Sequence, residues 1–389
     1  MHSATRSWTI NGDFLALPPN GVARYAREVT AALDALVEDG GPVVRDVAIE
    51  IVSPCVPREP LPLKAIPLRV VREYSRPRLP QFWVQAQLPW HVRGGLLSFC
   101  NLGPIAVSKQ IVCIHDLQTR LVPDSYGRGF RFAHRVLLPL LGRRCAGITT
   151  VSEFSRDHLI AFEVAPGRKI VVTCNGHEHA LRWDAQRSPL HLRPDRPYVL
   201  VLGRRHRHKN NELIGRLAGP LDRIGIDILV AGDMRREELF GHGSGPSNVS
   251  ILGRISDDDF AKALDRALCF LLPSRIEGFG LPALEAMARG CPTVVSQAAS
   301  LPEVCGDAAL YAAPDALDEW VTAIGRIHDD HALRETLRTR GPARARRFSW
   351  HAIAETYLAM MAAIDARAPI PGRETGPAYV EPLEPKGVR

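Results

Sequence analysis

The sequence lacks any run of about 18 consecutive apolar residues, so no segment has the length and composition of a membrane-spanning helix. Residues 1–8 also lack the apolar run of a secretory signal peptide, and we therefore expect no leader. Acidic residues are outnumbered by basic ones, 42 against 49, which leaves a net charge of +7. This balance favours anionic partners such as a diphosphate, an anionic membrane surface or nucleic acid, without choosing among them.

Paired metal-binding and redox motifs are also missing. None of the eight cysteines forms a Cys-x-x-Cys pair, and Cys113 and Cys269 sit inside apolar runs typical of a core. We therefore expect a reducing, cytoplasmic setting. The triplet 257–259, Asp-Asp-Asp, follows Ser256 and precedes a helical pattern, which indicates capping and not an Asp-x-Asp metal site. We expect neither a metal nor a cofactor.

The chain of 389 residues is too long for one hydrophobic core, which predicts two domains. Short continuous apolar runs alternate with helical patterns, as in parallel α/β sheets covered on both faces. One helical pattern places Val22, Val29 and Leu36 on a single face. The runs that we interpret as buried strands are 111–114, 148–151, 199–202, 226–231, 269–272 and 293–295.

The polar segment 184–197 contains two prolines and separates two such series, so we interpret it as the linker between domains. The expected division is a first domain over 1–183 and a second over 198–349. A helix over 350–365 is expected to pack back on the first domain. The tail 366–389 is rich in Pro, Gly and charged residues, which predicts disorder.

The most informative motif follows the apolar run 269–272. Gly278 and Gly280 allow a tight loop with close backbone approach to a ligand, and Pro282 suits the first turn of a following helix. The N–H groups of Gly280 and Leu281 would then form an anion site at the carboxyl end of a strand. This arrangement suits a diphosphate.

Two glutamates flank this loop. Glu277 by itself is explained as a solvated loop charge, and Glu285 as an acid favoured by the helix dipole. Their combination with the glycines and the proline favours a functional site instead.

The stretch resembles the Glu-x7-Glu signature of the retaining glycosyltransferase family 4. Further similarity lies in residues 201–204, 209–210, 248–253, 290–296 and 300–307. In the last segment, Ser300 and Glu303 also have the spacing of a helix capping box. The resemblance covers most of the second domain. It implies a GT-B fold, which is α/β with two Rossmann-like domains facing a central cleft.

The same resemblance implies roles for individual residues. Glu277 would lie near the transferred sugar, and Glu285 would bind the ribose hydroxyls. Arg204 and Lys209 would neutralise the diphosphate, with Arg205 as an alternative to Arg204; the alternative interpretation of this cluster is a basic surface loop. The remaining expected contacts are the base-holding loop Gly253, Arg254 and Ile255, and the phosphate loop Gly278, Phe279, Gly280 and Leu281.

Two candidates lie in the first domain. Gly21 precedes the first helical pattern and resembles the family's glycine loop, although an ordinary turn and cap would also explain it. His115 and Asp116 follow a buried strand and match the family's His-Asp pair at the sugar-facing edge. The alternative for His115 is a core histidine with satisfied hydrogen bonds. Ser152 is expected to cap a helix.

The segment 120–144 holds six arginines among Phe130, Phe132 and an apolar run. It could dock peripherally on an anionic membrane that carries a lipid-linked acceptor. An ordinary helix with a solvated basic face is the simpler explanation, and we favour it.

The resemblance implies metal-independent transfer of a sugar from a nucleoside-diphosphate sugar to a glycan or lipid-linked acceptor, with retention of configuration. The first donor to consider is GDP-mannose, by similarity to bacterial polysaccharide mannosyltransferases. Alternatives are an epimerase or phosphorylase of the same fold, or a basic nucleic-acid-binding protein; we expect no nucleic acid. An NAD-dependent enzyme is disfavoured because no Gly-x-Gly-x-x-Gly follows a strand.

Overall fold

A computed structural model describes residues 6–18, 20–71, 82–192, 196–241 and 245–371 of the chain. The chain divides into two compact units. The first contains residues up to Gly176 together with the C-terminal segment that begins at Ser349, and the second contains His177–Phe348. The boundary therefore lies at residues 176 and 177, ahead of the segment 184–197 that the prolines led us to expect as the linker.

The first unit is built on a seven-stranded sheet in the order β3-β2-β1-β4-β5-β6-β7, and every neighbouring pair is parallel. The predicted runs 111–114 and 148–151 form two of its strands. Its strands are β1 Arg6–Asn11, β2 Val47–Ser53, β3 Leu68–Val70, β4 Gly95–Ser98, β5 Gln110–Cys113, β6 Gly147–Thr150 and β7 Ile170–Val172.

The helices of the first unit begin with local signals that the sequence carries. The Asn20 side chain caps α1 by accepting a hydrogen bond from the Ala23 N–H at 2.9 Å, and Gly40 ends it with a positive φ of 68°. Ser152 caps α5 as predicted, through the Ser155 N–H. The α-helices are α1 Gly21–Asp39, α3 Gln118–Leu121, α4 Arg128–Arg144, α5 Glu153–Ala161 and α14 Trp350–Asp365.

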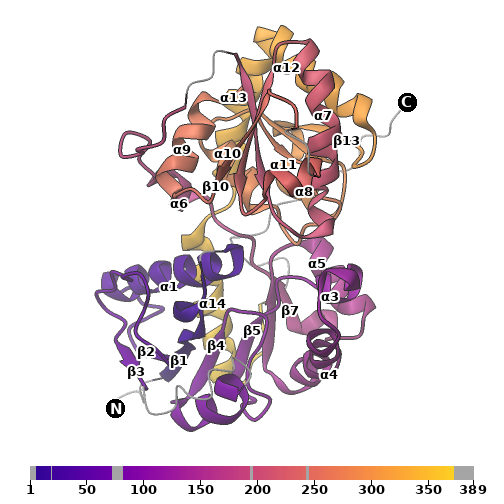
Figure 1. The fold of residues 1–389 in the computed structure, drawn as a ribbon. Coiled ribbons are helices and arrows are strands. Elements are labelled where there is room, and N and C mark those ends of the chain that lie inside the picture. Colours follow the sequence, from indigo (N-terminus) through magenta and orange to yellow (C-terminus); the bar gives the residue numbers. More distant parts are fainter. Residues whose placement is uncertain (1–5, 19, 72–81, 193–195, 242–244, 372–389) are drawn as a thin grey trace. The chain divides into compact units, whose positions relative to one another are not determined.

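Helix α14 follows the second unit in the chain but belongs to the first unit, where it lies beside α1 (Figure 1). The buried Tyr357 hydroxyl hydrogen bonds to Thr149 at 2.6 Å and to the Tyr25 hydroxyl at 3.0 Å. At the end of the helix, Asp365 lies 2.5 Å from the Lys109 ammonium and accepts from the Trp8 indole at 3.0 Å. These contacts join α14 to the sheet through both polar and charged groups.

The second unit is built on a six-stranded parallel sheet in the order β10-β9-β8-β11-β12-β13. All four apolar runs predicted here are strands. The strands are β8 Tyr198–Gly203, β9 Asp227–Gly232, β10 Val249–Gly253, β11 Cys269–Leu272, β12 Thr293–Ser296 and β13 Leu310–Ala312. The α-helices are α6 Glu178–Leu181, α7 Asn211–Arg223, α8 Arg236–Phe240, α9 Asp257–Arg266, α10 Leu281–Ala288, α11 Leu301–Cys305, α12 Leu317–Asp329 and α13 His331–Ala345.

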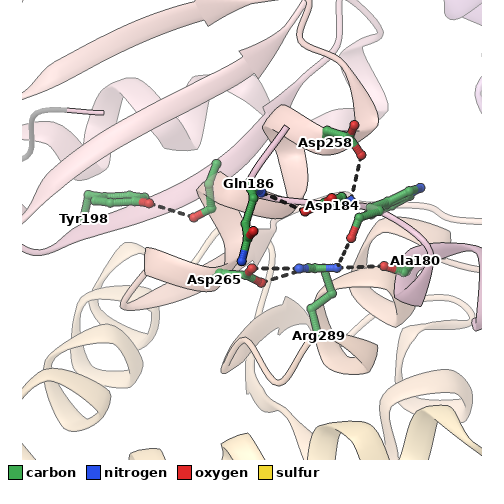
Figure 2. Close-up of polar contacts among 9 residues, drawn as sticks. Ala180, Asp184, Gln186, Tyr198, Asp258, Asp265 and Arg289 are labelled. Atoms are coloured by element: carbon green, nitrogen blue, oxygen red, sulfur yellow. Dashed lines mark hydrogen bonds and ion pairs between the residues drawn. The ribbon is translucent and has the colours of Figure 1, made fainter. Parts of the chain in front are cut away.

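Residues 184–192, expected to link two domains, instead pack on the second unit. The Asp184 N–H donates to the Asp258 carboxylate at 2.8 Å (Figure 2). The Ser188 hydroxyl donates to Asp259 at 2.5 Å. The polar composition that suggested a linker therefore serves hydrogen bonds to the first turn of α9. Asp259 also forms a capping box with Ser256, as the sequence predicted.

Residues 372–389, most of the tail for which we predicted disorder, lie outside the described part of the chain. Within the described part, no helix combines the length and the hydrophobicity needed to cross a lipid bilayer.

Candidate nucleotide-sugar site

The candidate site of the second unit lies where its sheet changes winding direction. β8 and β11 are neighbours at the centre of the sheet, and the chain leaves them in opposite directions, toward β9 and toward β12. Open α/β sheets bind ligands at such a point, outside the carboxyl ends of the strands. Arg204 follows β8 and Glu277 follows β11, so both predicted residues lie at this position.

The loop after β11 has the geometry that its glycines predicted. Gly280 has a φ of 96°, and a Cβ there would lie 2.5 Å from the Leu301 side chain. Only glycine fits this backbone without strain. The chain then enters α10 at Leu281 with Pro282 in its first turn, and Gly290 follows the helix with a positive φ of 71°. A helix N-terminus therefore lies at the carboxyl end of a central strand.

Glu277 and Lys209 form an ion pair. The Lys209 ammonium donates to Oε1 of Glu277 at 2.7 Å, and the Ser274 hydroxyl donates to the same oxygen at 2.7 Å. The Glu277 side chain is only 8% exposed, whereas Lys209 retains 21%. Since an ammonium carries three N–H donors, Lys209 keeps donors beyond the one that Glu277 uses. Glu277 is thus a buried, oriented carboxylate and not a solvated loop charge.

Ser300 has a different role from the capping interpretation of the sequence. Its side chain makes no capping hydrogen bond to α11 and instead donates to the backbone carbonyl of Glu277 at 3.0 Å. The hydroxyl therefore fixes the loop that carries Glu277. The spacing of Ser300 and Glu303 suggested a capping box because that pattern is local, whereas the partner is 23 residues away.

Glu285 lies in α10 and its carboxylate is held by a histidine. His179 Nε2 lies 2.9 Å from Oε1 of Glu285, and the two side chains are 1% and 7% exposed. No sequence motif marks His179 as a partner of Glu285. The neighbouring His177 has a different role, because its Nδ1 bonds the Phe348 carbonyl at 2.7 Å.

The basic side chains that follow β8 differ in their surroundings. Arg205 donates to the Asp233 carbonyl and pairs with Glu238 at 3.0 Å. The Arg204 guanidinium is half-buried and has no hydrogen-bonding partner among the residues that the structure describes. This difference favours Arg204 over Arg205 as the residue available to a ligand.

His208 lies beside Lys209 and is buried, and burial lowers its pKa to about 4, with the neighbouring Lys209 charge acting in the same direction. The ring is therefore neutral at neutral pH and adds no charge to this cluster.

The other predicted contacts occupy varied positions. Gly253 ends β10 with a φ of 70°, and the exposed Arg254 lies 3.8 Å from Asp233. Phe279 is buried edge-to-face against Phe348. Ile255 is half-buried. Gly278 lies in the loop between β11 and α10.

The candidate site residues of the first unit have surroundings that differ from those in the second unit. Gly21 is the first residue of α1, and no described atom lies within 4 Å of a Cβ built there, so packing does not require glycine. His115 is buried, with Nε2 2.8 Å from the Phe99 carbonyl, and burial lowers its pKa. The neutral ring therefore donates to that carbonyl, as a core histidine does. Asp116 accepts from the Gln118 N–H at 3.1 Å.

Sequence reasoning missed Asp13, which follows β1. Burial raises its pKa to about 7, while the nearby Asn11 side chain, Phe14 N–H and Cys100 thiol act in the opposite direction. β1 and β4 are the two neighbouring strands at which this sheet changes direction. Asp13 thus lies at the position where open sheets of this kind bind ligands, in the 3-10 helix Gly12–Ala16, and no motif marks it in the sequence.

Residues 184–344 match the family model described as glycosyl transferases group 1. The chain is 31% identical over 264 residues to O-antigen chain mannosyltransferase B of Escherichia coli, covering 64% of this chain and 68% of the relative. It is 28% identical over 223 residues to O-antigen chain mannosyltransferase RfbU of Salmonella typhimurium, covering 56% and 60%. The protein belongs to the group 1 glycosyltransferases.

Solved structures agree on the fold. Sucrose-phosphate synthase from Thermosynechococcus elongatus superposes with a TM-score of 0.69 at 20% identity, covering 93% of this chain and all of the other. The two parallel-sheet α/β units are those of the GT-B glycosyltransferase fold, as predicted. These similarities favour a glycosyltransferase over the epimerase, phosphorylase and nucleic-acid-binding alternatives.

Proposed function

We propose that the protein is a retaining glycosyltransferase that moves a sugar from a nucleoside-diphosphate sugar to a glycan acceptor in polysaccharide biosynthesis. The observation that carries this proposal is the ion pair of Lys209 and Glu277 beside the N-terminus of α10. It combines a cation for phosphate with a fixed carboxylate for a sugar. GDP-mannose is the donor that we propose first, because the curated relatives reported above are named as mannosyltransferases.

In the proposed reaction, the bond between the anomeric carbon and the diphosphate breaks, and negative charge accumulates on the departing phosphate. Lys209, Arg204 and the N–H groups at the start of α10 would stabilise that charge without a metal. The acceptor hydroxyl would attack from the same face as the leaving group and give its proton to the phosphate. Glu277 would orient the sugar and hold Lys209 in place.

The test of this proposal is Glu277→Gln, which keeps the size of the side chain and an oxygen that accepts from Lys209. We expect transfer from GDP-mannose to a membrane-extracted acceptor to fall by at least 10²-fold, with an unchanged thermal unfolding midpoint. The anomeric configuration of the wild-type product, read by NMR, tests retention. Near-normal turnover of Glu277→Gln, or an inverted product, would refute the corresponding part of the proposal.

We further propose that the acceptor is lipid-linked and that α4 docks on the anionic inner face of the membrane. The outward side of α4 carries an apolar stripe, with Phe132 71% exposed, Val136 42% and Leu140 36%. This stripe supports the docking proposal, because a helix that only presents a solvated basic face has no need of aligned, exposed apolar side chains.

The charges around this stripe fit the same surface. No acidic residue occurs in α4, and five arginines line it: Arg128, Arg131, Arg135, Arg143 and Arg144. None of the five has a carboxylate partner among the described residues. Cations flanking an exposed apolar stripe are typical of helices that lie in the interface of anionic bilayers.

Vesicle flotation tests this docking. We expect the protein to float with vesicles containing phosphatidylglycerol and not with pure phosphatidylcholine, and to be released by Phe132→Ser combined with Val136→Ser. Trp90→Ser is the matched control, because Trp90 is 86% exposed in the 3-10 helix Leu88–His91, outside α4. Equal loss of flotation in both variants, or no flotation at all, would exclude α4 as the docking surface.

A further inference from the structure

The buried contact between His179 and Glu285 links the candidate nucleotide site to the segment with which the second unit begins. His179 lies in α6, two residues after the boundary between the units, and Glu285 lies in α10. Nε2 and Oε1 are 2.9 Å apart, and both side chains are almost fully buried. Removing a carboxylate from water is costly unless a donor satisfies it, so a buried contact of this quality fixes the orientation of the carboxylate.

The imidazole is itself held in place. The Trp183 ring lies edge-to-face against it, with ring centroids 5.5 Å apart. Two backbone carbonyls of the same segment, Ala180 O at 2.9 Å and Trp183 O at 3.2 Å, accept from the Arg289 guanidinium (Figure 2). Arg289 is the C-cap residue that follows α10, and it binds Asp265 with two parallel hydrogen bonds of 2.8 and 2.7 Å.

The segment is therefore attached to α10 at two points one helical turn apart. At Arg289 the contact reaches only backbone carbonyls. At Glu285 it reaches the carboxylate of the residue that we propose for the ribose hydroxyls. If the only role of these contacts were to hold the segment against α10, the Arg289 contact would be sufficient. The second contact acts on a specific carboxylate oxygen, which an anchor does not require.

We propose that His179 is a positioning residue that holds the Glu285 carboxylate in the orientation that accepts hydrogen bonds from the nucleotide ribose. This inference rests on the proposed function, because it assigns a partner to Glu285 within the same site. The hydroxyls of a ribose donate to a carboxylate only if its oxygens are directed at them. An unconstrained glutamate would lose side-chain freedom on binding, and His179 removes that cost before the ligand arrives.

The experiment compares binding of GDP and of 2′,3′-dideoxy-GDP by calorimetry, with the UDP pair in parallel. For His179→Ala we expect the Kd of GDP to rise roughly tenfold and that of the dideoxy nucleotide to change less than twofold. Because Gln places an N–H donor near the position of Nε2, His179→Gln is expected to restore most of the affinity. A merely structural role would weaken both nucleotides alike and would not depend on the donor.

Two further variants separate the possible failures. Arg289→Ala loosens the same segment without touching the carboxylate, so it is expected to affect both nucleotides equally. Glu285→Gln tests the proposed function itself. If Glu285→Gln leaves GDP binding unchanged, the ribose assignment fails. If Glu285→Gln weakens GDP binding but His179→Ala does not, or weakens both nucleotides equally, the positioning role of His179 is overturned.

Discussion

The two units of this protein share a parallel sheet but use the polar groups at its carboxyl edge in different ways. In the second unit two buried carboxylates each have a basic partner, Glu277 with Lys209 and Glu285 with His179. In the first unit the buried polar groups are mainly neutral, such as His115 on the Phe99 carbonyl and the hydroxyls around Tyr357. The carboxyl edge of the second sheet therefore carries more buried ion-pairing groups than that of the first.

The proposed function accounts for this difference. A diphosphate that gains charge during reaction would need cations placed beforehand in a site that excludes water. An edge that bound only hydroxyl groups of an acceptor would need neutral donors and acceptors. Asp13 is the exception in the first unit, because burial makes its carboxyl titrate near neutrality. The predictions below test this contrast, from the largest expected effect to the smallest.

Lys209→Gln is expected to produce the largest effect, a fall in kcat/KM of roughly 10²- to 10³-fold. Gln retains an N–H donor for Glu277 but removes the charge that we propose to face the leaving phosphate. Steady-state kinetics with GDP-mannose measure the loss, and Arg205→Gln is the matched control because Arg205 pairs with Glu238. Equal loss of activity in both variants would mean that the basic residues act through their combined charge and not through Lys209 in particular. That result would weaken the contrast between the two units.

Asp13→Asn is expected to change the pH dependence of the first unit. With a raised pKa of about 7, folded Asp13 binds a proton that the unfolded chain releases above about pH 4, so stability falls as pH rises from 4 to 7. The variant should remove a penalty of roughly 3 kcal/mol at pH 8, after discounting for partial exposure, and almost none at pH 4. Hydrogen exchange of α1 amides at the two pH values measures this, and identical pH profiles would contradict it.

The second unit should respond to pH in the opposite direction through His208. Its lowered pKa of about 4 means that the unfolded chain takes up the proton first, so stability is lost as pH falls from about 6.5 to 4. The loss is roughly 2 kcal/mol. His208→Gln should remove it, as read from exchange of α10 amides. Persistence of the acid sensitivity in the variant would assign it to other groups.

The sequence predicted well what is encoded locally. The continuous apolar runs correctly predicted six strands. The glycines and Pro282 correctly predicted the loop and the start of α10. Both predictions succeed because backbone conformation in these segments depends on adjacent residues. Glu277 and Lys209 were both proposed, although only the fold shows that they form an ion pair.

What the sequence could not supply were partners far apart along the chain. Glu285 is paired with a histidine 106 residues away, and Ser300 holds the Glu277 carbonyl in place of a local cap. The polar composition of residues 184–192 is the same for a free linker as for a segment bonded to α9, so the boundary between the units was misplaced. Asp13 carries no motif, and its raised pKa arises only from burial.

Tyr357→Phe is expected to give the smallest effect. It tests whether the buried groups of the first unit contribute to stability as neutral groups. The variant removes one hydroxyl from the network with Thr149 and Tyr25 and leaves the ring packed, so the cost should be about 1 kcal/mol at every pH from 5 to 8. Urea unfolding monitored through the first unit measures it. Since Tyr357 carries no charge, a strongly pH-dependent loss would show that the first unit relies on ionised groups after all. A loss that does not vary with pH would leave charge as the property that separates the two sheet edges.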